Sequence, residues 1–188
     1  MNIILFDTDR ENLYPLSLTR PISDFRIGIS TIKEKWEFYY NDVSIKTDDY
    51  LSEKFPIKIE KDNLWINASV LPNEGVVTEI NSLRKGELLK KDEVVIAIHN
   101  HMFTTSELDE IQSHSTFNKI NDLWDIFSLN GEEIKNDFDR MVTPKRGQES
   151  RKEIETLKQI KESNVKIGNY PIHIEEGAKV NQSILNTT

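Results

Sequence analysis

The 188-residue sequence contains no cysteine. This absence excludes disulfides, a thiolate nucleophile and any zinc site built from cysteine, and it fits a reducing compartment. The opening residues, MNIILFD, carry no basic segment, and their apolar run is too short for a signal peptide or a membrane span. We therefore expect a cytoplasmic protein that makes no membrane contact.

Basic charge is also scarce. The chain has 24 lysines and arginines against 32 aspartates and glutamates, a net charge of −8, and no stretch gathers its basic residues into a patch. Nucleic acid is therefore not expected as a partner. An apolar content of 37% is enough for one core. The length suits one α/β domain of about 150 residues plus a short extra element.

Residues 2–36 predict a strand, a long polar loop and a helix. The strand, Ile3–Phe6, has four apolar residues without polar alternation, which is typical of an interior strand in a parallel sheet. The helix is expected over 27–39, where apolar residues recur at spacings of three and four. Open α/β sheets bind ligands where such a strand ends, so the polar residues of this loop and its margins are site candidates. They are Asp7, Asp9, Arg10, Thr19, Arg20 and Arg26.

Further elements follow along the chain. Hydrophobic patterning predicts strands at 42–45, 63–67, 87–90 and 94–98, and helices at 49–55, 72–83 and from 122 onward. Thr104 and Glu107 form a capping box that predicts a helix ending near Ser113. Asn67 closes the strand 63–67, where it could meet a sugar or nucleotide or simply cap a turn.

Two histidines, His99 and His101, follow the run 94–98 and suggest a metal site as an alternative to packing. In an extended segment, residues two apart point the same way. Zinc needs three or four ligands, however, and no third one is evident in the sequence. Packing is therefore the favoured interpretation.

The first loop and helix resemble the amino-terminal signature of bacterial sugar nucleotidyltransferases. The resemblance is carried by PLSLTRP at 15–21, Gly28 and TIKEKW at 31–36, with further similarity in WIN, LP and LWDIFSLN later in the chain. More narrowly, it points to a divergent branch fused to a left-handed β-helix acyltransferase, the N-acetylglucosamine-1-phosphate uridylyltransferase/glucosamine-1-phosphate N-acetyltransferase-like proteins. The Gly-rich G-x-G-T-R loop of the general family is replaced here by Asp7–Arg10, and Ile22 follows Pro21 where that family has lysine.

The resemblance implies an α/β fold, a Rossmann-like three-layer nucleotidyltransferase domain with a mostly parallel sheet. It also implies Mg²⁺-dependent transfer from a nucleoside triphosphate to a sugar 1-phosphate, with UTP and N-acetylglucosamine 1-phosphate as the expected pair and pyrophosphate as product. The candidate roles are catalysis by Arg20 and Lys35, substrate or nucleotide binding by Arg10, Thr19, Arg26 and Asn67, and magnesium binding by Asp7 and Asp9. The two aspartates could equally cap the loop. Loss of the Gly-rich loop leaves a second function open, a domain that binds a nucleotide sugar or supports assembly without catalysis.

The expected boundaries are a nucleotidyltransferase-like domain at 1–145, a charged linker helix at 146–163 and the first coil of a truncated hexapeptide-repeat β-helix at 164–188. Ile174 and Val180 lie six apart, as in such repeats. The resemblance implies that the full-length protein is bifunctional and forms a homotrimer through its β-helix. Assembly through this terminal segment alone is the third alternative.

Overall fold

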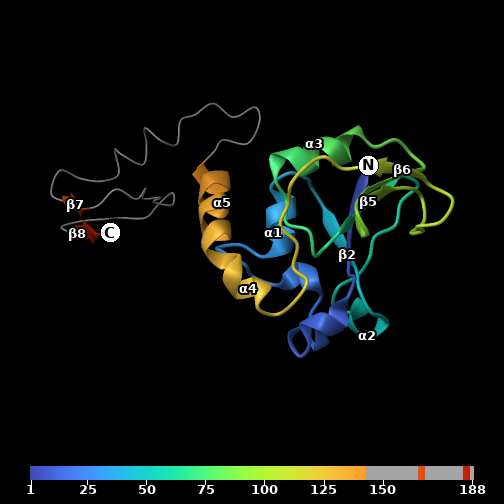
Figure 1. Cartoon of the computed structure of the whole chain (residues 1–188). Coiled ribbons are helices and arrows are strands. Elements are labelled where there is room, and N and C mark those ends of the chain that lie inside the picture. Colours follow the sequence, from blue (N-terminus) through green and yellow to red (C-terminus); the bar gives the residue numbers. More distant parts are fainter. Residues whose placement is uncertain (143–164, 168–183, 187–188) are drawn as a thin grey trace. The chain divides into compact units, whose positions relative to one another are not determined.

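The computed structural model describes residues 1–142, 165–167 and 184–186. Contacts divide the chain into two units, Met1–Asp137 and Phe138–Thr188. The first unit holds the sheet and all the candidate site residues (Figure 1). In the second, β7 (Val165–Ile167) pairs in parallel with β8 (Ile184–Asn186).

The first unit alternates strands with short helices. Its strands are β1 (Asn2–Phe6), β2 (Val43–Lys46), β3 (Asn63–Asn67), β4 (Glu87–Lys91), β5 (Val94–His99) and β6 (Asp109–Gln112). The α-helices are α1 (Ile32–Glu37), α2 (Asp49–Ser52), α3 (Glu74–Ser82), α4 (Asp125–Ser128) and α5 (Asn130–Val142), the last of which crosses the boundary between units. Three 3₁₀ turns, Arg10–Leu13, Leu16–Leu18 and Ile22–Asp24, shape the first loop.

The sheet is mixed, with the strand order β2-β1-β3-β5-β4-β6. β1 pairs in parallel with both β2 and β3, and β4 pairs in parallel with β6. β5 is antiparallel to its neighbours β3 and β4, so five strands share one direction. The predicted α/β fold with a mostly parallel sheet is therefore confirmed. The chain leaves β1 for β2 on one side and reaches β3 on the other, which makes the carboxyl ends of β1 and β3 a topological switch point.

The two faces of the sheet are covered differently. One carries the larger core cluster, in which Trp36 of α1 and Val76 and Ile80 of α3 pack with apolar residues of β1 and β3. The other has a smaller cluster around Phe6 and Trp65, against which Phe103 packs from the loop after β5. In the described part of the chain no helical residue belongs to this second cluster, where the three-layer prediction expected helices.

The first helix is shorter than the predicted range 27–39. Gly28 has φ +77° and the Ile27 amide bonds to the Ser30 carbonyl, so the chain turns before α1 begins. Thr31 then caps the helix, and its side chain and that of Glu34 form a capping box. The apolar periodicity of the sequence continues through this turn, so it gave no sign of it. The turn depends on the left-handed backbone conformation of Gly28, which glycine adopts without strain.

The predicted helix over 104–113 is wrong. Thr104 accepts a hydrogen bond from the Ser106 amide, a local turn that uses the hydroxyl which would have capped a helix. The residues after it form β6, whose backbone pairs with β4. Tertiary pairing thus overrides a local start signal.

The predicted linker helix at 146–163 lies outside the described residues, and so does most of the predicted coil at 164–188. The described part of the chain shows no β-helix. Among the same residues, no helix has the length and apolar character needed to cross a membrane.

Candidate functional site

Side chains from separate segments meet at the switch point. Thr8, just after β1, donates a hydrogen bond to the Asn67 Oδ1 at the end of β3 over 3.3 Å. The same oxygen accepts the Ser69 amide at 2.9 Å, while Asn67 Nδ2 donates to the Val95 carbonyl at 2.9 Å. Asn67 is buried, so its amide fixes the ends of β3 and β5 and offers Thr8 a fixed partner. The sequence left two roles open for Asn67, ligand contact or turn cap, and in the structure its amide is engaged in hydrogen bonds within the chain.

Asp9 and Lys119 complete this group, and we call Thr8, Asp9, Asn67 and Lys119 the strand-end cluster. Asp9 has an exposed side chain and a left-handed backbone with φ 52°. The Lys119 ammonium lies 3.6 Å from its carboxylate, although only 13% of the Lys119 side chain is exposed. Sequence reasoning missed Lys119, because nothing around an isolated loop lysine indicates that the chain returns to the end of β3.

Asp7 and Arg10 face inward instead. Arg10 Nη1 lies 2.6 Å from Asp7 Oδ2, and Arg10 Nε lies 2.9 Å from the Asp48 carboxylate. The guanidinium also donates to the Tyr50 hydroxyl at 3.1 Å and to the Ser17 carbonyl. Arg10, predicted to bind nucleotide, thus ties the first loop to β2 and α2.

The carboxyl group of Asp7 is fully engaged. Oδ1 accepts the Ile22 amide at 3.1 Å, and Oδ2 accepts the Thr47 hydroxyl at 2.7 Å besides Arg10. Burial raises the pKa of this carboxyl, against the opposing effect of these hydrogen bonds and of Arg10. Burial lowers the pKa of Arg10, but its contacts with Asp7 and its other partners outweigh this and raise it. With both oxygens used and the side chain buried, Asp7 does not fit the predicted role of magnesium ligand.

The loop around Arg20 is held in place by hydrogen bonds that its backbone carbonyls accept. The Tyr50 hydroxyl donates to the Leu18 carbonyl at 2.9 Å, and Arg10 reaches the Arg20 carbonyl at 3.4 Å. The side chains of Thr19 and Arg20 are consequently exposed. Within the described part of the chain, the Arg20 guanidinium makes no hydrogen bond or ion pair, so this cation is available to a ligand.

Lys35, predicted to be catalytic, lies in a buried ion-pair cluster. Its ammonium is fully buried, 2.6 Å from Asp137 Oδ2 and 2.9 Å from Glu133 Oε2. Asp137 Oδ2 also accepts the amides of Ile29 and Ser30, both at 2.9 Å. Lys35 therefore fastens α1 and the turn before it to α5, and it is not free to meet a phosphate.

The three arginines predicted as site residues do not come together in the structure. Arg26 is exposed, donates to the Ile29 carbonyl and lies 3.8 Å from Glu34 across the capping turn of α1. Arg10 is buried under the first loop, and Arg20 projects from it. Of the predicted residues, the structure brings Asp9 and Asn67 to the switch point and places Thr19 and Arg20 on an exposed loop.

Each histidine of the pair considered as a metal site lies within hydrogen-bond distance of another segment of the chain. His99 Nε2 lies 2.8 Å from Asp62 Oδ1, and its Nδ1 lies 3.0 Å from the Leu83 carbonyl. His101 Nδ1 lies 3.0 Å from the Glu60 carbonyl. The described residues contain no group of three acidic, histidine or cysteine side chains that could hold a metal.

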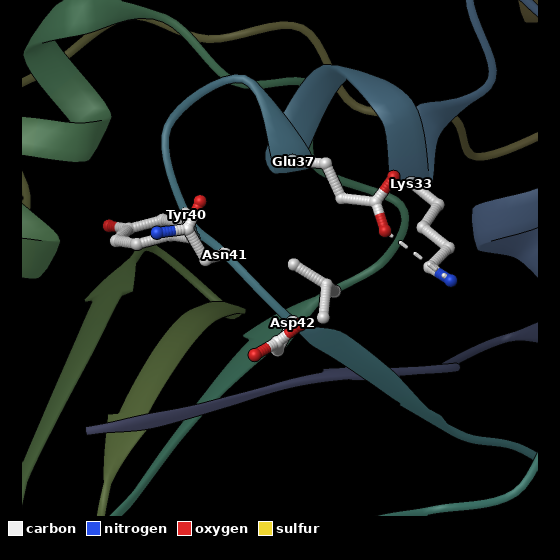
Figure 2. A pocket seen from close by; sticks show the side chains of 6 residues that line it. Lys33, Glu37, Tyr40, Asn41 and Asp42 are labelled. Carbon is white, nitrogen blue, oxygen red and sulfur yellow. Dashed lines mark ion pairs between the residues drawn. The ribbon is translucent and has the colours of Figure 1, made fainter.

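An open hollow of about 600 Å³ lies at the amino-terminal end of β2. Figure 2 shows Lys33 and Glu37 of α1 pointing toward each other above it, 3.4 Å apart. Its lining is Lys33, Glu37, Tyr40, Asn41, Asp42 and Val43. With its lysine paired and two acids present, this hollow is a poor site for phosphate.

Comparison with protein families gives a match over most of the chain. A family model described as sugar nucleotidyl transferase covers residues 3–146, from β1 through α5, and so includes the strand-end cluster and the loop of Arg20. The search of curated proteins returned no match.

Proposed function

Because the chain belongs to the sugar nucleotidyl transferase family, we propose that it transfers a nucleotidyl group from a nucleoside triphosphate to a sugar 1-phosphate. In this reaction a phosphate oxygen of the sugar forms a bond to the α-phosphorus, the bond from that phosphorus to the bridging oxygen breaks, and pyrophosphate leaves. UTP and N-acetylglucosamine 1-phosphate are the proposed pair, on the resemblance of PLSLTRP and TIKEKW to the divergent branch.

The strand-end cluster is the observation that carries the proposal. It sits at the switch point of the sheet, where open α/β sheets bind ligands. It combines a hydroxyl, a carboxylate and an ammonium, on Thr8, Asp9 and Lys119, around the structural amide of Asn67. Phosphoryl transfer depends mainly on positioning and on neutralising charge, and these groups suit both tasks.

The family's chemistry implies a magnesium ion, and we tested the two predicted ligands against the structure. Asp9 fits, because its carboxylate is exposed at the strand-end cluster. One or two carboxylates plus substrate phosphates are the usual protein contribution to a magnesium site. Asp7 does not fit, for the reason given above. When bound, the ion would neutralise phosphate charge beside Asp9, and Thr8 and Lys119 would position the phosphates.

The test is pyrophosphate release by the full chain with Mg²⁺, each common nucleoside triphosphate and several sugar 1-phosphates. We expect turnover that EDTA abolishes, and Arg20→Gln should lower kcat/KM roughly tenfold or more, since a charge-assisted contact is worth about 1.5–3 kcal/mol. Arg84→Gln is the matched control, because Arg84 is also exposed but precedes the amino-terminal end of β4, whereas the proposed site lies at the carboxyl ends of β1 and β3. No turnover with any pair would reject catalysis.

One observation favours a second candidate, a domain that binds a nucleotide sugar without catalysis. Two predicted cations, Arg10 and Lys35, are neutralised by buried acids, and the Gly-rich loop is replaced by Asp7–Arg10. This candidate predicts that UDP-sugar raises the melting temperature while no pyrophosphate appears. Loss of ligand stabilisation as well as turnover would exclude both candidates.

A further inference from the structure

We infer that Lys119 is the cation that binds a substrate phosphate at the strand-end cluster, an inference that rests on the proposed function and adds a residue that neither the sequence motifs nor the family match assigns.

The backbone places Lys119 at this point. Residues 118–120 run antiparallel to 69–71, since the Leu71 amide bonds to the Asn118 carbonyl and the Ile120 amide to the Ser69 carbonyl, each at 2.9 Å. Ile120 is buried in the main core. Neighbouring side chains of an extended segment point to opposite sides. Lys119 therefore leaves the core and reaches Asp9 at the end of β1.

The ammonium of Lys119 is held without being neutralised at close range. Its Nζ donates to Asn121 Oδ1 at 2.6 Å, and its distance of 3.6 Å from Asp9 exceeds the usual 2.7–2.9 Å of a charge-assisted hydrogen bond. Lys35 and Arg10, by contrast, each contact an acid at 2.6 Å. A phosphate can consequently approach Lys119 without first breaking a close ion pair.

The low exposure of the Lys119 side chain also favours phosphate binding. Only 13% of the Lys119 side chain is exposed, so its conformation is largely fixed before any ligand arrives. A phosphate that binds Lys119 then pays less of the entropy needed to order a long side chain. Arg20 is exposed and has no ion-pair partner among the described residues, and it offers the same charge without this preorganisation.

The neighbouring Asp9 gives the inference a second, opposite consequence. Without a metal ion its carboxylate repels a phosphate drawn to Lys119. Asp9→Asn should therefore strengthen metal-free binding of an anion, whereas Lys119→Gln should weaken it. A purely structural role for the Asp9–Lys119 contact predicts no such opposition, because both changes would then break the same pair.

The experiment is calorimetric titration of the full chain with inorganic pyrophosphate in the presence of EDTA. Lys119→Gln should raise the Kd roughly ten- to hundredfold, the equivalent of one charge-assisted contact, and Lys119→Arg should stay within a few-fold of the wild type. Asp9→Asn should lower the Kd. Lys61→Gln should leave it unchanged, because Lys61 is an exposed lysine that precedes the amino-terminal end of β3, whereas the cluster lies at the carboxyl end of that strand.

The outcomes separate this inference from the proposed function. Pyrophosphate binding that Lys119→Gln weakens, in a chain that turns over no substrate, supports the lysine and rejects catalysis. Turnover in a chain whose Lys119→Gln variant binds pyrophosphate as tightly as wild type rejects the lysine and keeps the function. Absence of wild-type binding also overturns the inference. Melting curves identify a Lys119→Gln variant that does not fold. In that case the Kd values of the other two variants decide: Lys119→Arg, which keeps the charge, should bind pyrophosphate like the wild type, and Asp9→Asn should bind it more tightly.

Discussion

Replacing Lys35 by methionine should remove a large part of the stability of the first unit. The ammonium is fully buried between Asp137 and Glu133, at 2.6 and 2.9 Å. Methionine fills most of the same space but removes the positive charge that lies between the two carboxylates. Removing one partner of a buried ion pair costs about 3–5 kcal/mol, against a total unfolding free energy of roughly 5–15 kcal/mol for an ordinary domain. The two amides that bond to Asp137 remain, so we expect the lower half of that range.

The loss can be measured by urea denaturation followed through tryptophan fluorescence, since Trp36 is fully buried beside Lys35 in the sequence of α1. Lys33→Met is the matched control on the same helix. Its ion pair with Glu37 is partly exposed, with a distance of 3.4 Å, and should contribute only about 0.3–0.5 kcal/mol.

A double-mutant cycle identifies the cause. Glu133→Gln in the Lys35→Met background should restore part of the lost stability, with a coupling free energy above about 1 kcal/mol, because it removes the buried negative charge that faced the Lys35 ammonium. If Lys35→Met costs no more than Lys33→Met, or if the cycle shows no coupling, the argument that this cluster fastens α1 to α5 is refuted.

Three further changes test the fold around the site. Gly28→Ala should cost roughly 2–4 kcal/mol by urea denaturation, because φ is +77° and a new Cβ would lie 2.7 Å from the α5 backbone; Gly86→Ala, at φ +92° with nothing within 4 Å, should cost about 1–2 kcal/mol. Glu79→Gln should cost roughly 1–2 kcal/mol at pH 7. Burial acts to raise the pKa of Glu79, but its hydrogen bonds to 113–115 outweigh this and lower the pKa below 4.5. The unfolding free energies of wild type and variant should therefore converge as the pH falls through that lowered value. A difference that stays constant with pH would contradict this. Asn67→Ala should lower the melting temperature by several degrees, since it removes the hydrogen bonds to the buried Ser69 amide and to the half-buried Val95 carbonyl.

The strands could be predicted because their signal is local. β3 spans the predicted residues 63–67, and the hairpin of β4 and β5 follows from two apolar runs with a tight turn between them. The segment 104–113 failed because its capping box is satisfied by a turn and the choice of strand is made by β4, far away in the sequence. Patterns within a few residues contain no information about such partners.

The site was predicted less well for the same reason. The sequence placed Asp9 and Asn67 at strand ends, and the structure brings them to the switch point. It also indicated cations on the first loop and helix, but not which acids they meet. Arg10 is paired with Asp7 three residues earlier, whereas Lys35 is paired with Asp137, a hundred and two residues later. Lys119 reaches the cluster only through a backbone bridge to Val70.

The residues that carry the family resemblance meet one another in space. Gly28, from the first signature, donates its amide to Asn130 Oδ1 at 2.8 Å, and Asn130 closes the LWDIFSLN stretch. Lys35, from TIKEKW, joins Asp137 one turn further along α5 than Glu133. PLSLTRP is fixed by the carbonyl contacts of Arg10 and Tyr50. These stretches therefore specify how the first loop, α1 and α5 are held together, and a chain can retain them for stability alone. Catalysis must be judged instead by pyrophosphate release, and the variants of Arg20 and Lys119, whose side chains make none of these contacts, then test which cations bind the substrate phosphates.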